Sequence, residues 1–550
     1  MGAFELALSF PGDPHIELPH ALLLSYPEPL QGRLIPHVNF GNILCYVQEM
    51  EADWDPNDLA TTYQAVDNQI RTTLIESIAK VEAGDASAAA LEGEFGAYWL
   101  HEGTVYLLSD LKRSDRLQCR IAKPTDTPEK PNPQSGRFEL ISSNQQDDED
   151  CQNWLSQRKL KAASSVAFPA HYVRVKPSKL VGEKWPPDNF KSLLKWLSEV
   201  DPSARARIAE CIAKNQVKTH VILLDVAQQE VVGVFIELNL RALALAQYFS
   251  AKTTSKKRKT SVPKISKLAA SLSSSRATMA FHRLKVVQTD RNTILSRNRK
   301  RPEVGDLRSK QIALVGCGTI GGHIASLLLR GGAGCGSAAF DLFDGDTFSP
   351  GNFGRHYLST SDIDENKSVA LAKALTSSTH LAHNINGKGQ NFSITTRELE
   401  KYDIVLDATG RPPVAKRLAS VAREIAGARP ILIHGFNDGN GRASKVVVDD
   451  GERCYGCMLA EKAFYKDGID MRFKNIELQG EKRISCGSTY TPYDASVSII
   501  TAGMMQEAAL NCLEKQFPWT YSEHIFDGSR SKRSRHIPNQ AGCKICNAEL

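Results

Sequence analysis

A glycine-rich loop between an apolar run and a helical pattern constrains the fold of this chain more than any other stretch. Residues 312–315 form a continuous apolar run, GCGTIG follows from Gly316, and HIASLLLR then repeats its apolar side chains with a helical period. This order predicts a buried strand, a tight turn and a helix. Because backbone N–H groups at the start of a helix hold anions, the stretch predicts an α/β domain that binds phosphate at this loop.

The residues after the loop narrow the choice of nucleotide. A second predicted strand, 338–343, ends in Asp344, where a Rossmann-type site places its ribose-binding acid. The glycines alone are also compatible with a nicotinamide or flavin site. Asn352, Arg355 and Lys367 follow, however, and hydride transfer needs no pair of cations there. These cations favour a triphosphate.

Strand and helix patterns continue to alternate through the C-terminal half. A helix is predicted over 286–298 and another over 368–378, with strands at 403–407, 429–435 and 443–450. This alternation predicts a mostly parallel sheet with the ligand at the carboxyl ends of its strands.

The N-terminal half contains four segments with different sequence patterns. Residues 4–80 alternate as strands and become helical over 58–78, and residues 94–110 predict a hairpin. Residues 124–150 are rich in proline, acid and amide, which predicts a linker. Beyond it, residues 217–238 predict two strands around a polar turn, in a mixed α/β region without a catalytic constellation.

Composition and charge are those of an ordinary globular protein. The net charge of +6 is mild for 550 residues, and much of it lies in the basic stretch 252–267. No aromatic residues interleave with that stretch, so it predicts a solvated loop rather than a nucleic-acid site. No apolar run approaches the roughly 20 residues of a membrane span, and the N-terminus lacks a signal pattern. We expect a cytoplasmic protein that binds neither membrane nor nucleic acid.

Twelve cysteines in such a chain are expected to be metal ligands or nucleophiles rather than disulfides. Cys454 and Cys457 form one CxxC pair, and Cys543 and Cys546 form a second. Together they predict a four-cysteine structural zinc site that ties the C-terminus back onto its domain. The alternatives are redox-active or idle thiols.

Residues 283–550 closely resemble the ThiF- and MoeB-like adenylation domain, which ubiquitin-activating enzymes share with the sulfur-carrier activators of thiamine and molybdenum-cofactor synthesis. The ordered set that carries the resemblance is Gly316, Gly318, Gly321, Asp344, Asn352, Arg355, Lys367 and the two CxxC pairs. In that family the enzyme binds ATP and the C-terminal glycine of a protein and makes an acyl adenylate. The resemblance implies that Asp344 holds the ribose hydroxyls, while Asn352, Arg355 and Lys367 surround the phosphates.

One position departs from the family pattern. Many relatives carry a metal-binding aspartate three residues after the acid that ends the next strand, but this chain has Gly410 there, which leaves Asp407. Asp407 is therefore included in the nucleotide site. Either Asp407 or another acid helps to hold Mg²⁺, or the nucleotide itself holds the ion.

Cys486 lies in a polar segment just before a helix predicted from Asp494 onward, where thiol-forming relatives carry their nucleophile on a crossover loop. A cysteine near a helix N-terminus can have a lowered pKa, and Arg483 is close in sequence. The alternative is a buried apolar cysteine, as predicted for Cys512. We interpret Cys486 as the nucleophile.

The N-terminal residues 1–123 look like the core of a ubiquitin-conjugating enzyme. Gly41, Cys45, Trp54 and Pro56 occur in the order typical of such domains and precede a helical pattern. By that resemblance Cys45 accepts the acyl group as a thioester, whereas taken alone it could be a small buried cysteine in a strand. His37 and Asn39 only approximate the histidine-proline-asparagine signature, with a shorter spacing to the cysteine.

An activating domain (283–550) and a conjugating domain (1–123) around a middle region (124–282) resemble the bacterial fusion enzymes of anti-phage CBASS operons. Those enzymes attach the C-terminus of a cGAS-like nucleotidyltransferase to targets. The resemblance implies adenylation, thioester formation on Cys486 and transfer to Cys45 for delivery to an amine. It also implies a homodimer, in which Arg297 reaches a phosphate of the neighbouring subunit.

Three alternatives remain open from the sequence. The same chemistry could act on a bacterial ubiquitin-like protein instead of a nucleotidyltransferase. The glycine loop could belong to a nicotinamide-dependent oxidoreductase, which would bind NAD without ATP. The chain could also be a noncovalent scaffold that binds nucleotide as a structural element.

Overall fold

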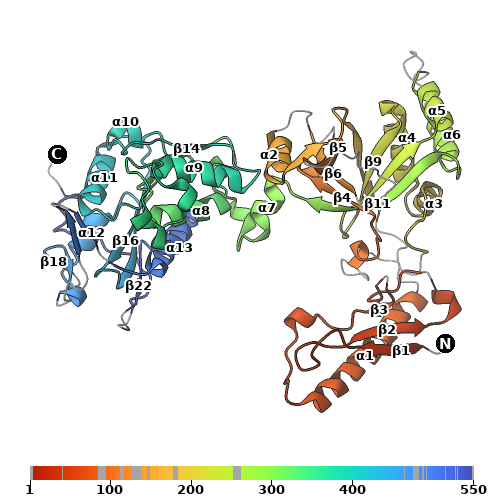
Figure 1. Cartoon of the computed structure of the whole chain (residues 1–550), viewed down its shortest axis with the longest axis horizontal. Coiled ribbons are helices and arrows are strands. Elements are labelled where there is room, and N and C mark those ends of the chain that lie inside the picture. Colours follow the sequence, from red (N-terminus) through yellow and green to blue (C-terminus); the bar gives the residue numbers. More distant parts are fainter. Residues whose placement is uncertain are drawn as a thin grey trace. The chain divides into compact units, whose positions relative to one another are not determined.

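The computed structural model divides into two compact units, residues 1–290 and 291–550 (Figure 1). The residues that it describes are 4–31, 33–39, 41–83, 94–111, 117–125, 138–144, 149–176, 184–251, 262–463, 465–474, 482–485, 488–490, 492–514, 516–526, 528 and 531–547. Within these ranges, no helix combines the length and the apolar composition that crossing a membrane requires.

Seven strands of the described C-terminal unit form one sheet in the order β14-β13-β12-β15-β16-β17-β22. The first five run parallel to one another, and β17 and β22 add antiparallel pairs. The strands are β12 Ile312–Val315, β13 Phe340–Phe343, β14 Ile385–Gly387, β15 Ile404–Asp407, β16 Ile431–Asp438, β17 Ala443–Asp449 and β22 Tyr521–Ile525. The predicted parallel sheet is confirmed, and β12 has the predicted bounds.

Helices cover both faces of this sheet (Figure 1). Residues of α8, α9 and α13 share one buried cluster with the sheet, and residues of α10, α11 and α12 share a cluster on the other face. The helices are α7 Arg291–Arg297, α8 Thr319–Arg330, α9 Lys367–Ser378, α10 Thr396–Leu399, α11 Pro412–Glu424, α12 Tyr455–Leu459 and α13 Ala495–Asn511. Two short hairpins, β18 Tyr465–Lys466 with β19 Ile469–Asp470 and β20 Lys482–Ser485 with β21 Ser488–Tyr490, complete the unit.

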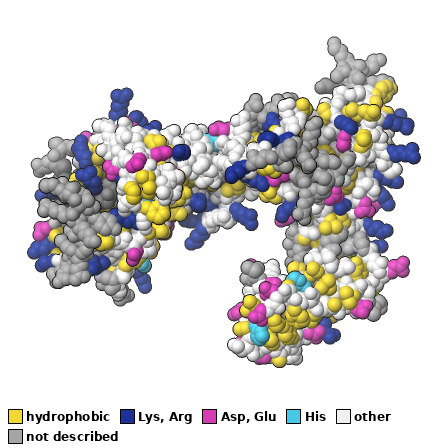
Figure 2. Space-filling model, in the orientation of Figure 1, with side chains coloured by type: hydrophobic (Ala, Val, Ile, Leu, Met, Phe, Trp, Pro, Cys, Tyr) yellow, Lys and Arg dark blue, Asp and Glu magenta, His cyan; other side chains and the backbone are white. Residues whose placement is uncertain are grey.

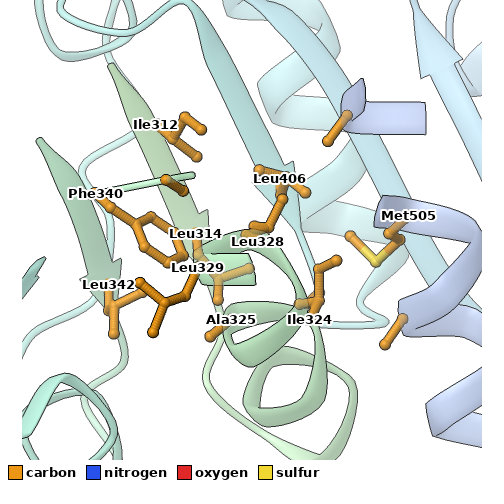
Figure 3. Packing of buried hydrophobic residues seen from close by; sticks show 14 of the residues in the cluster. Ile312, Leu314, Ile324, Ala325, Leu328, Leu329, Phe340, Leu342, Leu406 and Met505 are labelled. Carbon is orange, nitrogen blue, oxygen red and sulfur yellow. The ribbon is translucent and has the colours of Figure 1, made fainter. Parts of the chain in front are cut away.

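The core on the α8 face shows why the glycine loop has a fixed position. Leu314 of β12 and Leu406 of β15 pack against Ile324 and Leu328 of α8, with Met505 of α13 beside them (Figure 3). All five side chains are fully buried. Side chains of this size stabilise a fold by roughly 1.5–3 kcal/mol each when buried. The core therefore anchors both the strand that enters the loop and the helix that leaves it.

The first part of the N-terminal unit, residues 4–83, pairs a small antiparallel sheet with one long helix. The strands are β1 Glu5–Ser9, β2 His20–Ser25 and β3 Ile43–Leu44, and the helix is α1 Leu59–Glu82. The predicted helix is confirmed and extends further than expected. Asp58 caps it by accepting a hydrogen bond from the Thr61 N–H. Several large hydrophobic side chains stay on the surface here, among them Leu24 and Ile75. Figure 2 shows hydrophobic side chains in yellow on the surface of this part of the chain.

Eight strands of the described residues 94–290 form a second, mixed sheet in the order β6-β4-β11-β10-β9-β8-β5-β7. The strands are β4 Gly103–Leu107, β5 Leu117–Pro124, β6 Phe138–Ser143, β7 Leu160–Ala162, β8 Phe168–Val175, β9 Thr219–Val226, β10 Val232–Leu238 and β11 Thr278–Gln288. The helices are α2 Glu149–Gln157, α3 Phe190–Val200, α4 Pro202–Asn215, α5 Leu240–Ala251 and α6 Val262–Leu272. The strand pair predicted around a polar turn is confirmed as β9 and β10.

Two local predictions in this region are wrong. Residues 94–110 do not form a hairpin, because Phe95 and Trp99 are core residues that pack on Trp185, and β4 instead pairs in parallel with β6 and β11. The predicted linker contains β6, which buries Leu140. The alternation pattern and the polar composition gave wrong predictions here, because β4 and β6 form through pairing with strands that lie far away in the sequence.

Two of the domain boundaries expected from the sequence fall within strands. The expected boundary after residue 123 falls inside β5, and the boundary after residue 282 falls inside β11. Both strands are hydrogen-bonded into the same sheet, so neither can be divided between domains. The predicted helix 286–298 is correspondingly shorter, because the chain is still in β11 until Gln288 and α7 begins at Arg291.

Two buried histidines lie side by side in this sheet. His171 on β8 and His220 on β9 are joined by a hydrogen bond of 3.0 Å between Nε2 and Nδ1. His220 Nε2 lies 2.9 Å from the Val217 carbonyl oxygen and must donate to it, so His171 donates to His220 and both rings are neutral. Burial lowers the pKa of His171 to about 3 and that of His220 to about 4.

We expect the stability of the middle domain to fall as the pH falls from about 6.5 to about 4. In this pH window the histidines of the unfolded chain bind protons, whereas the buried rings of the folded chain stay neutral. The free energy of unfolding therefore rises with pH, and it stops rising above the ordinary histidine pKa. The loss is at most about 2 kcal/mol per histidine between pH 7 and pH 5. Urea unfolding followed by tryptophan fluorescence measures it, because Trp99, Trp185 and Trp196 lie in this core.

His171→Phe should reduce this pH dependence, whereas His20→Gln, which changes an exposed histidine, should preserve it. An unchanged pH dependence in His171→Phe would contradict the assignment.

Candidate active site

The glycine loop is tightly packed at one point and open at another. Gly316 has a φ of +90°, and a side-chain carbon on Gly321 would lie 1.9 Å from the Gly316 carbonyl oxygen. Gly321 thus lets α8 start directly against the loop. Gly318, the N-cap of α8, has open space where a side chain would be. The N-terminus of α8 therefore faces a space in which backbone N–H groups can hold a phosphate.

Asp344 is tied to the loop from the end of the neighbouring strand β13. Its Oδ2 accepts a hydrogen bond of 2.7 Å from the Cys317 N–H, and its Oδ1 accepts one of 2.8 Å from the Asp346 N–H. A carboxylate has about four acceptor positions, so these bonds orient the group and leave capacity for ribose hydroxyls. This geometry fits a nucleotide ribose beside the glycine loop.

Lys367 is brought to Asp344 by the start of α9. Asn366, the N-cap of that helix, donates from Nδ2 to the Asp344 carbonyl oxygen over 2.9 Å. The Lys367 side chain is largely buried, and its Nζ lies 3.2 Å from Asp346 Oδ2. A cation in the first turn of a helix opposes the helix dipole. A bound anion would offset that cost, which points to a functional rather than a structural lysine.

Asn352 and Arg355 lie on a short 3₁₀ helix, η9 Pro350–Arg355. The side-chain oxygen of Asn352 accepts hydrogen bonds from the backbone and hydroxyl of Ser349, which caps η9. The Arg355 carbonyl oxygen lies 3.2 Å from His323 Nε2 of α8, and its guanidinium carbon lies 4.5 Å from the ring centroid of Tyr493. Both residues thus sit on an element that is attached to α8.

Asp407 is engaged in the protein interior. Its Oδ1 accepts hydrogen bonds from the backbone and hydroxyl of Thr409, its Oδ2 lies 3.0 Å from His434 Nδ1, and only 3% of its surface is exposed. Thr409 in turn packs against Gly316. This arrangement does not fit a direct metal ligand, and it assigns Asp407 to supporting the loop after β15.

His356 and Tyr493 were not identified from the sequence. His356 Nε2 lies 2.8 Å from the Cys317 carbonyl oxygen while its Nδ1 accepts from the Leu358 N–H, so the ring is neutral and braces the glycine loop. Burial lowers its pKa. His356 follows Arg355 directly, which was the one available signal, whereas nothing in the sequence links Tyr493 to Arg355.

Cys45 lies at the end of β3 with its side chain exposed. Its N–H donates to the His37 carbonyl oxygen over 2.7 Å. The Asn39 side-chain oxygen accepts from the Gly41 and Ile43 N–H groups, which shapes the turn before the cysteine. An exposed thiol on a braced turn is accessible to an acyl donor, and the alternative of a buried cysteine is wrong. Cys486, the second predicted nucleophile, lies outside the described residues.

The four cysteines of the two CxxC pairs come together, as predicted. Their Sγ atoms lie within 4.8 Å of one another, with separations of 3.6 Å for Cys454 to Cys543 and 3.5 Å for Cys457 to Cys546. A tetrahedral zinc ion with bonds of about 2.3 Å has sulfur atoms about 3.8 Å apart. The cluster therefore fits a zinc staple that joins α12 to the C-terminal residues.

A buried ionic network joins β17 to the ends of β16 and β19. Lys445 of β17 has no exposed surface, and its Nζ lies 2.5 Å from Asp438 and 2.6 Å from Asp470. Arg472 extends the network by binding both Asp470 and Glu523. Breaking one partner of such a buried pair typically costs about 3–5 kcal/mol. The network therefore holds the β16–β17 turn in a fixed position.

Comparisons with known proteins find family matches for the N-terminal and the C-terminal part of the chain. Residues 1–108 match the Prokaryotic E2 family B, and residues 289–543 match the ThiF family. The ATP-dependent ubiquitin transferase-like protein Cap2 of Vibrio cholerae serotype O1 is 49% identical over 551 residues, which cover 99% of this chain and 92% of that protein. The chain belongs to this Cap2 family.

A second Cap2, from Escherichia coli strain TW11681, is 45% identical over 99% of this chain and 92% of its own length. Among solved structures, the crystal structure of E. coli MccB with MccA-N7isoASN covers 56% of this chain and 88% of its own chain at 15% identity, with a TM-score of 0.33.

Family membership establishes the class of enzyme. The chain is an ATP-dependent ubiquitin transferase-like enzyme that carries an E2-like domain and a ThiF adenylation domain in one polypeptide. The expected fusion of the two domains is confirmed. The two alternative functions, a nicotinamide-dependent oxidoreductase and a noncovalent scaffold, are therefore wrong for this chain.

We expect the purified chain to contain one zinc ion, and Cys543→Ser to lose it. Removing one thiolate opens the tetrahedral set and releases the C-terminal residues from α12, so the thermal unfolding midpoint should fall as well. Elemental analysis by mass spectrometry measures the metal. Cys211→Ser, which changes a half-buried cysteine of α4, should keep both the zinc and the midpoint. Full zinc content in Cys543→Ser would contradict the assignment.

Proposed function

We propose that this enzyme adenylates the C-terminal carboxylate of a protein and passes the acyl group from Cys486 to Cys45. The observation that carries the proposal is the convergence of the α8 N-terminus, Asp344 and Lys367 at the carboxyl ends of β12 and β13 in a chain of the Cap2 family. An anion-binding helix start, a ribose acceptor and a buried cation are together the requirements of an ATP site.

In the first reaction, a carboxylate oxygen of the protein substrate attacks the α-phosphorus of ATP. A new O–P bond forms, the bond to the β-phosphate breaks, and pyrophosphate leaves. Negative charge accumulates on the phosphate oxygens in the transition state, so fixed cations stabilise it more than they stabilise the bound nucleotide. Arg355 and Lys367 would supply this charge, with Asn352 beside them.

Magnesium would be held chiefly by the nucleotide phosphates, which is its usual mode of binding in such sites. Asp407 lies inside the protein, and Asp344 is assigned to the ribose. The neutralising charge on the protein side therefore comes from Arg355 and Lys367.

In the second reaction, the Cys486 thiolate attacks the acyl carbon, a thioester forms and AMP leaves. The Cys45 thiolate then attacks this thioester and releases Cys486. Finally, a target amine attacks the Cys45 thioester, so that an amide forms, the cysteine departs as thiolate and the amine gives up a proton. Fusion of both cysteines in one chain, or their approach within a dimer, raises the effective concentration for the handover.

The proposed carboxyl donor is a cGAS-like nucleotidyltransferase, as in anti-phage CBASS operons, and the proposed acceptors are protein amines. The family resemblance supports this choice, and a ubiquitin-like protein with a C-terminal glycine is the second candidate. We further propose a homodimer, in which Arg297, an exposed residue at the end of α7, reaches a phosphate of the second subunit.

Lys367→Gln should lower the rate of ATP–pyrophosphate exchange by about 10²–10³-fold, because it removes a fixed charge from the transition state. The assay uses the full chain with the nucleotidyltransferase as carboxyl donor. The thermal unfolding midpoint should not fall, since the substitution also removes a cation from a helix N-terminus.

Lys373→Gln is the matched control, because Lys373 lies on the same helix with an exposed side chain, and it should exchange at the wild-type rate. Equal rates for the two variants would show that the nucleotide site is misplaced.

The order of the two cysteines predicts distinct intermediates. With ATP and the nucleotidyltransferase, Cys45→Ala should accumulate a thioester on Cys486, whereas Cys486→Ala should form none on either residue. Non-reducing electrophoresis with and without reducing agent, followed by peptide mass spectrometry, identifies the modified cysteine. Cys211→Ala serves as the control. A reducible adduct that persists when Cys45 and Cys486 are both alanine would exclude the relay.

A further inference from the structure

Tyr493 lies beside the proposed phosphate-binding arginine without belonging to the nucleotide site. It comes immediately before Asp494, the N-cap of α13, and its side chain is half-buried. The Arg355 guanidinium carbon lies 4.5 Å from the centroid of the Tyr493 ring. This distance is within the range of a cation–π interaction.

The position of Tyr493 is also restricted by the turn between β16 and β17. Gly441 in this turn has a φ of +85°, and a side-chain carbon on it would lie 2.4 Å from the Tyr493 Cβ. An ion pair of 2.5 Å between Lys445 Nζ and Asp438 Oδ2 stabilises this turn. Tyr493 thus contacts a braced backbone through its Cβ and the Arg355 side chain through its ring.

Such packing matters because arginine is a long side chain with many rotamers. Holding it in one orientation before the nucleotide binds reduces the side-chain entropy that is lost on binding. Stacking uses the flat face of the guanidinium, and the N–H donors lie in the plane of that face, pointing to its edges. An arginine whose guanidinium carbon lies over a ring can therefore still bind phosphate oxygens through the N–H donors that the ring does not cover.

We propose that Tyr493 is a positioning residue that holds Arg355 in the orientation required for the α-phosphate of ATP. The proposal rests on the assignment of Arg355 to the phosphates in the proposed function. Tyr493 itself would touch neither the nucleotide nor the carboxylate, and it would act only through Arg355.

A double-mutant cycle in ATP–pyrophosphate exchange tests this relation, with the full chain and the nucleotidyltransferase as carboxyl donor. Tyr493→Leu, which removes the aromatic face, should lower kcat/KM for ATP by about 3–30-fold, mainly through kcat. Tyr493→Phe keeps the face and should stay within about twofold of wild type. In an Arg355→Ala background, Tyr493→Leu should change the rate by less than about twofold, because the group it positions is already absent.

Three outcomes would overturn the inference, and they separate it from the proposed function. Equal effects of Tyr493→Leu in the two backgrounds would show that Tyr493 acts independently of Arg355, while the adenylation site would stand. Wild-type exchange in Tyr493→Leu would show that the stack has no role. Wild-type exchange in Arg355→Ala would remove the phosphate assignment of Arg355 and the inference with it.

Unchanged zinc content and thermal unfolding midpoint verify that the variants are folded. If Tyr493→Leu does not fold, Tyr493→Met replaces it, since it also lacks an aromatic face, and the same cycle then decides.

Discussion

The direct contact between the first turn of α8 and the carbonyl oxygen of Gly316 is the constraint on which the candidate site depends. No side chain fits at Gly321, so the helix begins as close to the end of β12 as a backbone allows. The helix N-terminus is thereby placed at the carboxyl edge of a parallel sheet. Asp344, from the end of the next strand, reaches the Cys317 N–H only because loop and strand end at the same level.

From this point a chain of hydrogen bonds leads outward to the charged residues. Asn366 joins the start of α9 to the end of β13 and so sets Lys367 over Asp346, while His356 and His323 attach η9 to the glycine loop and α8. Arg355 lies on the short 3₁₀ helix η9, which has no buried residues, and Lys367 lies in the first turn of α9. The positions of Arg355 and Lys367 depend on these polar contacts, in which the buried His356 and the half-buried His323 take part.

The sequence predicted the C-terminal fold well because its signals are local. An apolar run, a glycine turn and a helical period each depend on neighbouring residues. β12 and α9 begin and end near the expected positions, and α13 begins near its expected start. The middle domain was predicted less well. There Phe95 and Trp99 resemble strand residues but pack in a core whose other members lie far along the chain, and β4 has parallel partners that no local pattern reveals.

For the candidate site, the sequence by itself determined which chemical groups are present: glycines between a strand and a helix, an acid at the end of the next strand, two cations and an ordered set of cysteines. These follow from residue type and spacing. Only the tertiary structure decided which groups meet. It buried Asp407 between Thr409 and His434, exposed Cys45, closed the four cysteines into one cluster and placed the Arg355 guanidinium over the Tyr493 ring. These contacts join distant parts of the chain, and packing rather than local periodicity selects them.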